Sequence, residues 1–153
     1  MLTLTLGDLN DEKFMDSIGK LADNSELPVD VAQNISELLQ EISNSTRDAK
    51  FKYMELIKDF AKFDDDGSLV PEVVDGKPVK DSWVFNTPEA EEEKIKFLDK
   101  WIGVNNSFLA EKVHFKKVDP VELQDLENCG LSPRDLMYLA PIIKNLDEED
   151  LPN

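Results

Sequence analysis

The chain has 153 residues and a formal net charge of −16 at pH 7, from 33 acidic and 17 basic side chains. This length fits one domain, or one domain with an arm. A hydrophobic content of 41% can build a core, which excludes a disordered acidic tail. The excess of acids argues against direct binding to nucleic acid or to an anionic membrane surface, because both need Lys and Arg.

The sequence also predicts where such a chain is found. No apolar run approaches the ~18 residues that a membrane span needs. The first residues lack a basic segment followed by a long apolar one, so we expect no signal peptide. The single Cys129 cannot form an intramolecular disulfide and fits a reducing compartment.

The first 28 residues predict a strand and a short helix. Leu2, Leu4 and Leu6 alternate with small or polar residues, which is typical of a half-buried strand. Asn10 is the expected N-cap of a helix of about 13 residues, whose apolar face begins at Phe14.

A long helix is predicted over residues 29–63, which contain neither Pro nor Gly. Hydrophobic residues recur there at steps of three and four, from Val31 to Phe63. The stripe weakens over the four residues from Ser43 to Thr46, where a bend and a polar patch on a continuous helix are both open. So long a helix needs a second helix or a partner beside it, and that neighbour can come from this chain or from a second copy.

A hairpin and a second long helix are expected next. The acidic turn ending at Gly67 should stop the first long helix, and residues 68–74 and 79–85 read as β-like arms around the turn Asp75-Gly76. Thr87 is the expected N-cap of a helix over residues 88–110. Its predicted apolar face consists of Ile95, Leu98, Trp101, Ile102 and either Phe108 or Leu109.

The C-terminal third predicts one strand and short helices. Residues 112–118 alternate and could pair with the N-terminal strand, with Val113 and Phe115 on one side. Ser132 starts a final helix that Pro141 should kink or shorten. The predicted fold is α+β and helix-dominated, with a long antiparallel helical hairpin, a small β element and short packing helices. We expect a single domain over 1–153, with an arm at 29–63 and 88–110, a cap at 1–28 and 111–146, and an acidic tail at 147–153.

The charge is unevenly distributed along the chain. Residues 64–99 carry eleven acids against four bases, and residues 119–153 carry nine against two. Residues 100–118 carry four bases, Lys100, Lys112, Lys116 and Lys117, against one acid. The acidic stretches are either an ordinary solvated surface or a face that docks on a basic partner and imitates nucleic-acid phosphate.

No catalytic, cofactor or metal motif stands out. If Gly67 took the sixth position of a calcium loop, Lys62 and Val73 would occupy positions one and twelve, where acidic ligands are required. Cys129 and the only histidine, His114, could form a dyad, but acidic neighbours raise a thiol pKa. The sequence therefore predicts no enzyme, no cofactor and no metal.

Aromatic residues give a more useful signal. Trp83, Phe85, Trp101 and Phe108 would lock the hairpin onto the second long helix if they are buried. If they are exposed, they would be interface anchors, because aromatic residues are enriched in binding hot spots. The same alternatives hold for Phe51 and Tyr53, which lie off the main stripe of the first long helix.

The order of these features resembles a family of small uncharacterised proteins of tailed bacteriophages of the siphovirus type. The resemblance covers nearly the whole chain, and its most specific part is the end, LQDLE at 123–127, LSPRDL at 131–136 and LAPII at 139–143. It implies a virion or assembly role without catalytic residues, in the cytoplasm of the bacterial host or in the virion.

We therefore expect a non-enzymatic phage protein that acts through protein–protein contacts, as a virion or assembly component. The alternative is an acidic phage inhibitor of a host nuclease or defence complex. The expected partner is a phage structural protein or a host protein, or a second copy of the chain. The residues predicted to bind it are Phe51, Tyr53, Asp64, Asp65, Asp66, Trp83, Glu91 and Glu92.

Overall fold

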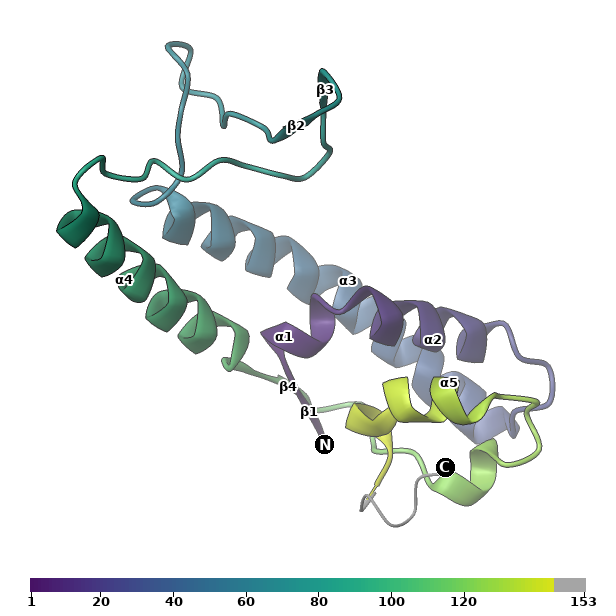
Figure 1. The fold of residues 1–153 in the computed structure, drawn as a ribbon. Coiled ribbons are helices and arrows are strands. Elements are labelled where there is room, and N and C mark those ends of the chain that lie inside the picture. The colour runs from purple at the N-terminus through teal and green to yellow at the C-terminus, as the bar shows by residue number, and fades with distance from the viewer. Residues whose placement is uncertain (145–153) are drawn as a thin grey trace. The chain divides into compact units, whose positions relative to one another are not determined.

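A computed structural model describes residues 1–144 (Figure 1). The chain divides into two compact units. Unit 1 comprises Met1–Ala49 and the chain from Phe108 onward, and unit 2 comprises Lys50–Ser107. The prediction of a helix-dominated α+β fold is confirmed. The single domain over 1–153 stays a prediction, and the acidic tail expected at 147–153 lies outside the described residues.

Unit 1 opens with strand β1 (Leu2–Thr5) and helices α1 (Leu6–Leu9) and α2 (Glu12–Ala22). The expected N-cap at Asn10 is wrong, since Asn10 is the C-cap of α1 and Asp11 caps α2. The reason is a capping box between Thr5 and Asp8. The Thr5 N–H donates to the Asp8 carboxylate at 2.9 Å, and the Asp8 N–H donates to the Thr5 hydroxyl at 3.1 Å. This box starts a helical turn directly after the strand.

Strand β4 (Lys112–Phe115) pairs with β1, the pairing that the sequence suggested, and the two strands run antiparallel. Leu2 lies opposite Phe115 and Leu4 lies opposite Val113. The inward side chains are therefore apolar, while Thr3 and His114 are exposed on the outer face. The strand ends at Phe115, earlier than the predicted 118, because the chain turns there with the Val118 N–H bonded to the Phe115 carbonyl at 3.3 Å.

The last described part of unit 1 contains three short helices, η1 (Leu123–Leu126), α5 (Pro133–Tyr138) and η2 (Ala140–Ile142). Ser132 caps α5, as predicted, and forms a capping box with Asp135. The predicted effect of Pro141 is also confirmed, since α5 ends at Tyr138 and Pro141 lies in η2. Ile143 then forms a parallel bridge with Val121, and both residues belong to the core of the unit.

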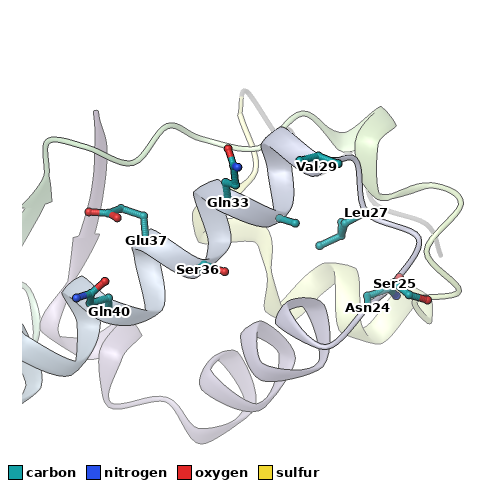
Figure 2. Close-up of a pocket in the computed structure, with 9 residues that line it drawn as sticks. Asn24, Ser25, Leu27, Val29, Gln33, Ser36, Glu37 and Gln40 are labelled. Atoms are coloured by element: carbon teal, nitrogen blue, oxygen red, sulfur yellow. The ribbon is translucent and has the colours of Figure 1, made fainter.

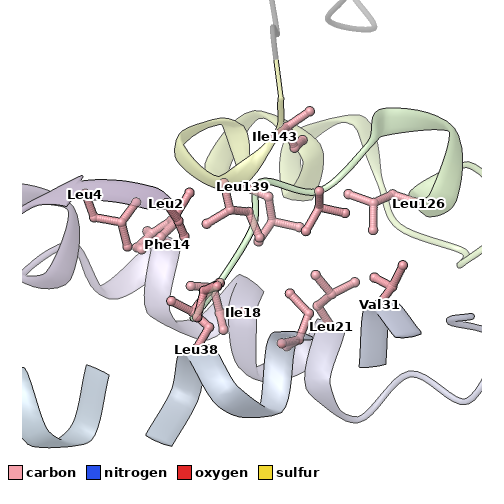
Figure 3. Close-up of a cluster of buried hydrophobic side chains, with 14 of the residues drawn as sticks. Leu2, Leu4, Phe14, Ile18, Leu21, Val31, Leu38, Leu126, Leu139 and Ile143 are labelled. Carbon is pink, nitrogen blue, oxygen red and sulfur yellow. The ribbon is translucent and has the colours of Figure 1, made fainter. Parts of the chain in front are cut away.

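The core of unit 1 brings together β1, β4, α2, α5 and the first half of helix α3 (Val29–Ile57). Figure 3 shows these apolar side chains converging between the helices. Nineteen of the 22 buried hydrophobic residues that the structure describes belong to unit 1. The predicted stripes of α2 and α3 supply many of them: Phe14, Ile18, Leu21, Val31, Ile35, Leu38 and Ile42.

Helix α3 is continuous through Ser43 to Thr46, where the Thr46 hydroxyl donates to the Ile42 carbonyl at 2.8 Å. Its predicted extension to residue 63 is wrong, because the helix ends at Ile57. The Ala61 N–H bonds the Ile57 carbonyl at 2.8 Å and closes the last turn. The Lys62 N–H then bonds the Val84 carbonyl at 2.8 Å, so the backbone here pairs with a distant segment instead of continuing the helix.

The predicted hairpin arms of unit 2 are wrong in extent. Strands β2 (Val73–Val74) and β3 (Lys77–Pro78) have two residues each, joined by the predicted turn at Asp75 and Gly76. The remaining backbone forms separate bonds between three segments. The Val70 N–H bonds the Lys62 carbonyl and the Val84 N–H bonds the Val70 carbonyl, each at 3.0 Å.

Helix α4 (Glu91–Leu109) begins three residues later than predicted from Thr87. The Lys94 N–H bonds the Ala90 carbonyl at 2.8 Å, so Ala90 precedes the helix. Two residues of its predicted apolar face are exposed, Ile95 at 58% and Ile102 at 55%. The predicted face covered a wider arc than unit 2 can shield, and no residue of α4 is fully buried.

Candidate interaction surface

An aromatic cluster holds unit 2 together. It consists of Phe60, Trp83, Phe85, Phe97 and Trp101. The Trp101 ring lies at its centre, with ring centroids 5.1 Å from Trp83, 5.2 Å from Phe60 and 5.5 Å from Phe85, all edge to face. Such pairs are worth about 0.5–1.5 kcal/mol each beyond the area that they bury.

The cluster lies between the two alternatives that the sequence left open, full burial and exposure. Trp83 and Phe85 do fasten the segment before α4 onto that helix, and Trp83 Nε1 also donates to Tyr53 Oη at 3.1 Å. Yet Trp83, Phe85 and Trp101 are only half-buried. Phe108, which we grouped with them, belongs to unit 1.

Most of the large hydrophobic side chains that are exposed in the described chain lie in unit 2. Eight of the eleven that are exposed lie in it. They come from the end of α3, from the connection to α4, which includes β2 and β3, and from α4 itself. They are Phe51, Met54, Phe63, Val73, Val74, Val79, Ile95 and Ile102.

The acidic residues singled out from the sequence also lie in unit 2. The Asp64 carboxylate accepts the N–H groups of Asp66 at 3.0 Å and of Ser68 at 2.9 Å, so it stabilises the turn itself. Asp65 and Asp66 are exposed beside it. Glu91 and Glu92 are exposed in the first turn of α4, where they favour the helix dipole.

All eight residues predicted to bind a partner therefore belong to one unit. Six are exposed, and Tyr53 and Trp83 are half-buried and bonded to each other. Sequence reasoning missed Met54 and the valines of the hairpin, and it assigned Ile95 and Ile102 to the core. A signal for the two isoleucines was present, since they lie one heptad apart and off the positions of Phe97 and Trp101.

Unit 1 has a hollow of about 560 Å³ along the start of α3 (Figure 2). Figure 2 shows Gln33, Glu37 and Gln40 spaced along the helix, with Leu27 and Asn24 on the preceding loop. Glu37 is the only ionisable residue that lines the hollow. The other polar groups that line it are the amides of Asn24, Gln33 and Gln40 and the hydroxyls of Ser25 and Ser36.

The two residues of the possible dyad, Cys129 and His114, both make structural contacts. Cys129 is buried, and desolvation, followed by the charges of Glu26 and Asp125, raises the pKa of its thiol. The His114 ring nitrogen Nδ1 lies 3.0 Å from the Thr3 hydroxyl. Within residues 1–144 no group of three or more His, Cys, Asp or Glu side chains is placed to hold a metal ion.

Comparison with protein-family models, curated proteins and solved structures finds no match to this chain. A search of the described helices finds none that is long and apolar enough to cross a membrane. The surfaces of the two units are therefore what indicates the function of this chain.

Proposed function

We propose that this chain is a non-enzymatic protein that acts through protein–protein contacts, and that unit 2 provides the binding surface. One observation carries the proposal. Unit 2 holds eight of the eleven large hydrophobic side chains that are exposed in the described chain, but only three of the 22 buried hydrophobic residues. Apolar surface that is concentrated and surrounded by charged residues is typical of interaction sites.

Helix α4 has the clearest need for a partner. It has 19 residues and none of them is fully buried. Ile95 and Ile102 are separated by two turns and lie on one side of the helix. Burying an exposed Ile side chain contributes about 1.5–3 kcal/mol, so a groove that accepts both residues would supply a substantial part of the free energy of binding.

The resemblance to tailed-bacteriophage proteins favours a virion or assembly component that binds a phage structural protein. Its expected locations are the cytoplasm of the bacterial host and the virion. Mass spectrometry of purified virions tests this setting, since a structural component should be present at a fixed copy number. Absence from virions together with binding to a host protein would contradict it.

The acidic-inhibitor alternative has less support. Unit 2 contains the turn at Asp64 to Asp66 and the start of α4, but its thirteen acids are accompanied by nine lysines. Mixed charge lowers the potential that an imitation of nucleic acid would need. Binding to a DNA-binding host protein that falls steeply between low and high salt would favour this alternative over the first.

A matched pair of variants tests the binding surface. After the partner is captured from infected bacteria and purified, Ile95→Gln with Ile102→Gln should weaken direct binding at least about tenfold, or ~1.4 kcal/mol. Val29→Gln with Met137→Gln changes two exposed hydrophobic residues of unit 1 and should leave binding unchanged.

Two results would contradict the proposal. One is an equal loss of binding in both double variants, which would place the contact elsewhere. The other is turnover of nucleotides, nucleic acids or peptides by the purified chain that disappears when one or two carboxylates are removed.

A further inference from the structure

Three exposed lysines gather on the outer face of the β1–β4 sheet and in the turn that follows β4, on an otherwise acidic chain. Val113 and Phe115 point towards the core of unit 1, so Lys112 and His114 lie on the outer face of β4 and are exposed. Lys116 continues this alternation in the turn that follows, and Lys117 is exposed beside it. We call these four residues the basic face.

The lysines of the basic face are not used in the ion pairs found in the described part of unit 1. Three of those pairs join Lys20 to Asp135, Lys144 to Glu122, and the N-terminal ammonium group to Asp119. Asp119, the next acidic residue after the basic face in the chain, is therefore paired with the N-terminal ammonium group, at 3.2 Å. On the neighbouring strand, Thr3 contributes a hydroxyl group 3.0 Å from His114 Nδ1.

We propose that the basic face binds an extended, carboxylate-rich segment of a protein partner. Lys112 and His114 lie two residues apart on β4, a spacing of roughly 6.6–7 Å along a strand, and Lys116 and Lys117 follow in the turn. An extended segment with acidic residues at alternate positions presents carboxylates at the same spacing. Opposite charges facing each other in this way stabilise paired extended segments.

A protein segment fits this face better than nucleic acid or an anionic membrane. The face contains Lys and His but no Arg, whose planar guanidinium is the side chain best suited to bidentate contact with phosphate. The net charge of −16 also repels a polyanion far more strongly than it repels a short segment with a few carboxylates. This surface lies in unit 1, so it is independent of the surface proposed for unit 2.

The proposal is tested with the full chain and a short synthetic peptide in which Glu alternates with Thr. The peptide should shift the backbone amide resonances of Thr3 and of residues 112–117, and the same peptide with Gln should not. Lys112→Gln, Lys116→Gln and Lys117→Gln combined should weaken binding at least about fivefold at low ionic strength. The corresponding Arg substitutions should preserve it.

The matched control changes three exposed lysines of unit 2, Lys77, Lys80 and Lys94, to Gln. This variant has the same net charge as the first but should bind the peptide normally. Equal weakening of peptide binding in both variants would overturn the proposal, because the net charge of the chain, and not the basic face, would then explain the binding. Tighter binding to single-stranded DNA or to phosphatidylserine vesicles than to the peptide would also overturn it, and so would failure of the Glu peptide to bind.

Discussion

At the residue scale, Asp135 shows how an acidic side chain can stabilise an acidic protein. Its carboxylate accepts the Ser132 N–H at 3.2 Å and lies 3.2 Å from Lys20 Nζ. Partial burial would raise the pKa of Asp135, but the hydrogen bonds from Ser132 and the contact with Lys20 outweigh it and hold the pKa below its ordinary value. These contacts join α2 to α5.

The lowered pKa gives a prediction for stability against pH. A carboxyl group with a lower pKa in the folded state stabilises the protein above its unfolded pKa of about 3.9, and this contribution is lost as the pH falls through the folded value. Asp135→Asn should therefore lower the free energy of unfolding by about 0.5–1.5 kcal/mol at pH 7 and by progressively less below pH ~4. Urea unfolding across this pH range measures it.

Asp16→Asn is the matched control, because Asp16 is an exposed residue of α2. Asp16→Asn should change the free energy of unfolding little, both at pH 7 and below pH ~4. If the difference in free energy of unfolding between Asp135→Asn and the original chain did not depend on pH, the stabilising role of the ionised Asp135 carboxylate would be contradicted.

At the element scale, the sequence predicted the parts that local signals determine. Helix α5 follows from its Ser132 cap and Pro133, and β1 follows from its alternation. The end of α3 could not be predicted, since residues 58–63 keep a helical pattern. What ends the helix is backbone pairing of Lys62 with Val84 and Val70, and a local pattern does not contain such distant contacts. The exposure of Ile95 could not be predicted for the same reason, because it depends on which other segments of unit 2 cover α4.

Two glycines of unit 2 should respond in opposite directions to Ala. Gly76 has φ of 77° in the hairpin turn, where an L side chain is strained, so Gly76→Ala should destabilise by about 1–2 kcal/mol. Gly103 lies inside α4 with open space around its Cα, so Gly103→Ala should stabilise by about 0.5–1 kcal/mol. Urea unfolding followed by Trp fluorescence measures both, and changes of equal sign would contradict the turn geometry.

At the scale of the whole molecule, the two units differ in what holds them together. Unit 1 has a continuous core, whereas in unit 2 only Ile57, Phe60 and Ala61 are buried hydrophobic residues. A domain of about 60 residues is marginally stable even with a full core. Unit 2 is therefore expected to open at a lower free energy than unit 1, and a partner that covers its apolar surface would oppose this opening.

Tryptophan fluorescence separates the two units, because Trp83 and Trp101 are the only tryptophans and both lie in unit 2. Circular dichroism at 222 nm reports the helices of both units. In urea, the fluorescence transition should precede the larger part of the circular dichroism transition, and hydrogen exchange should be slow in α2 and the first half of α3 but fast in α4. Coincident transitions would instead mean that the chain unfolds as the single cooperative domain expected from its length. The weak core of unit 2 would then be stabilised by unit 1 and would not require a partner.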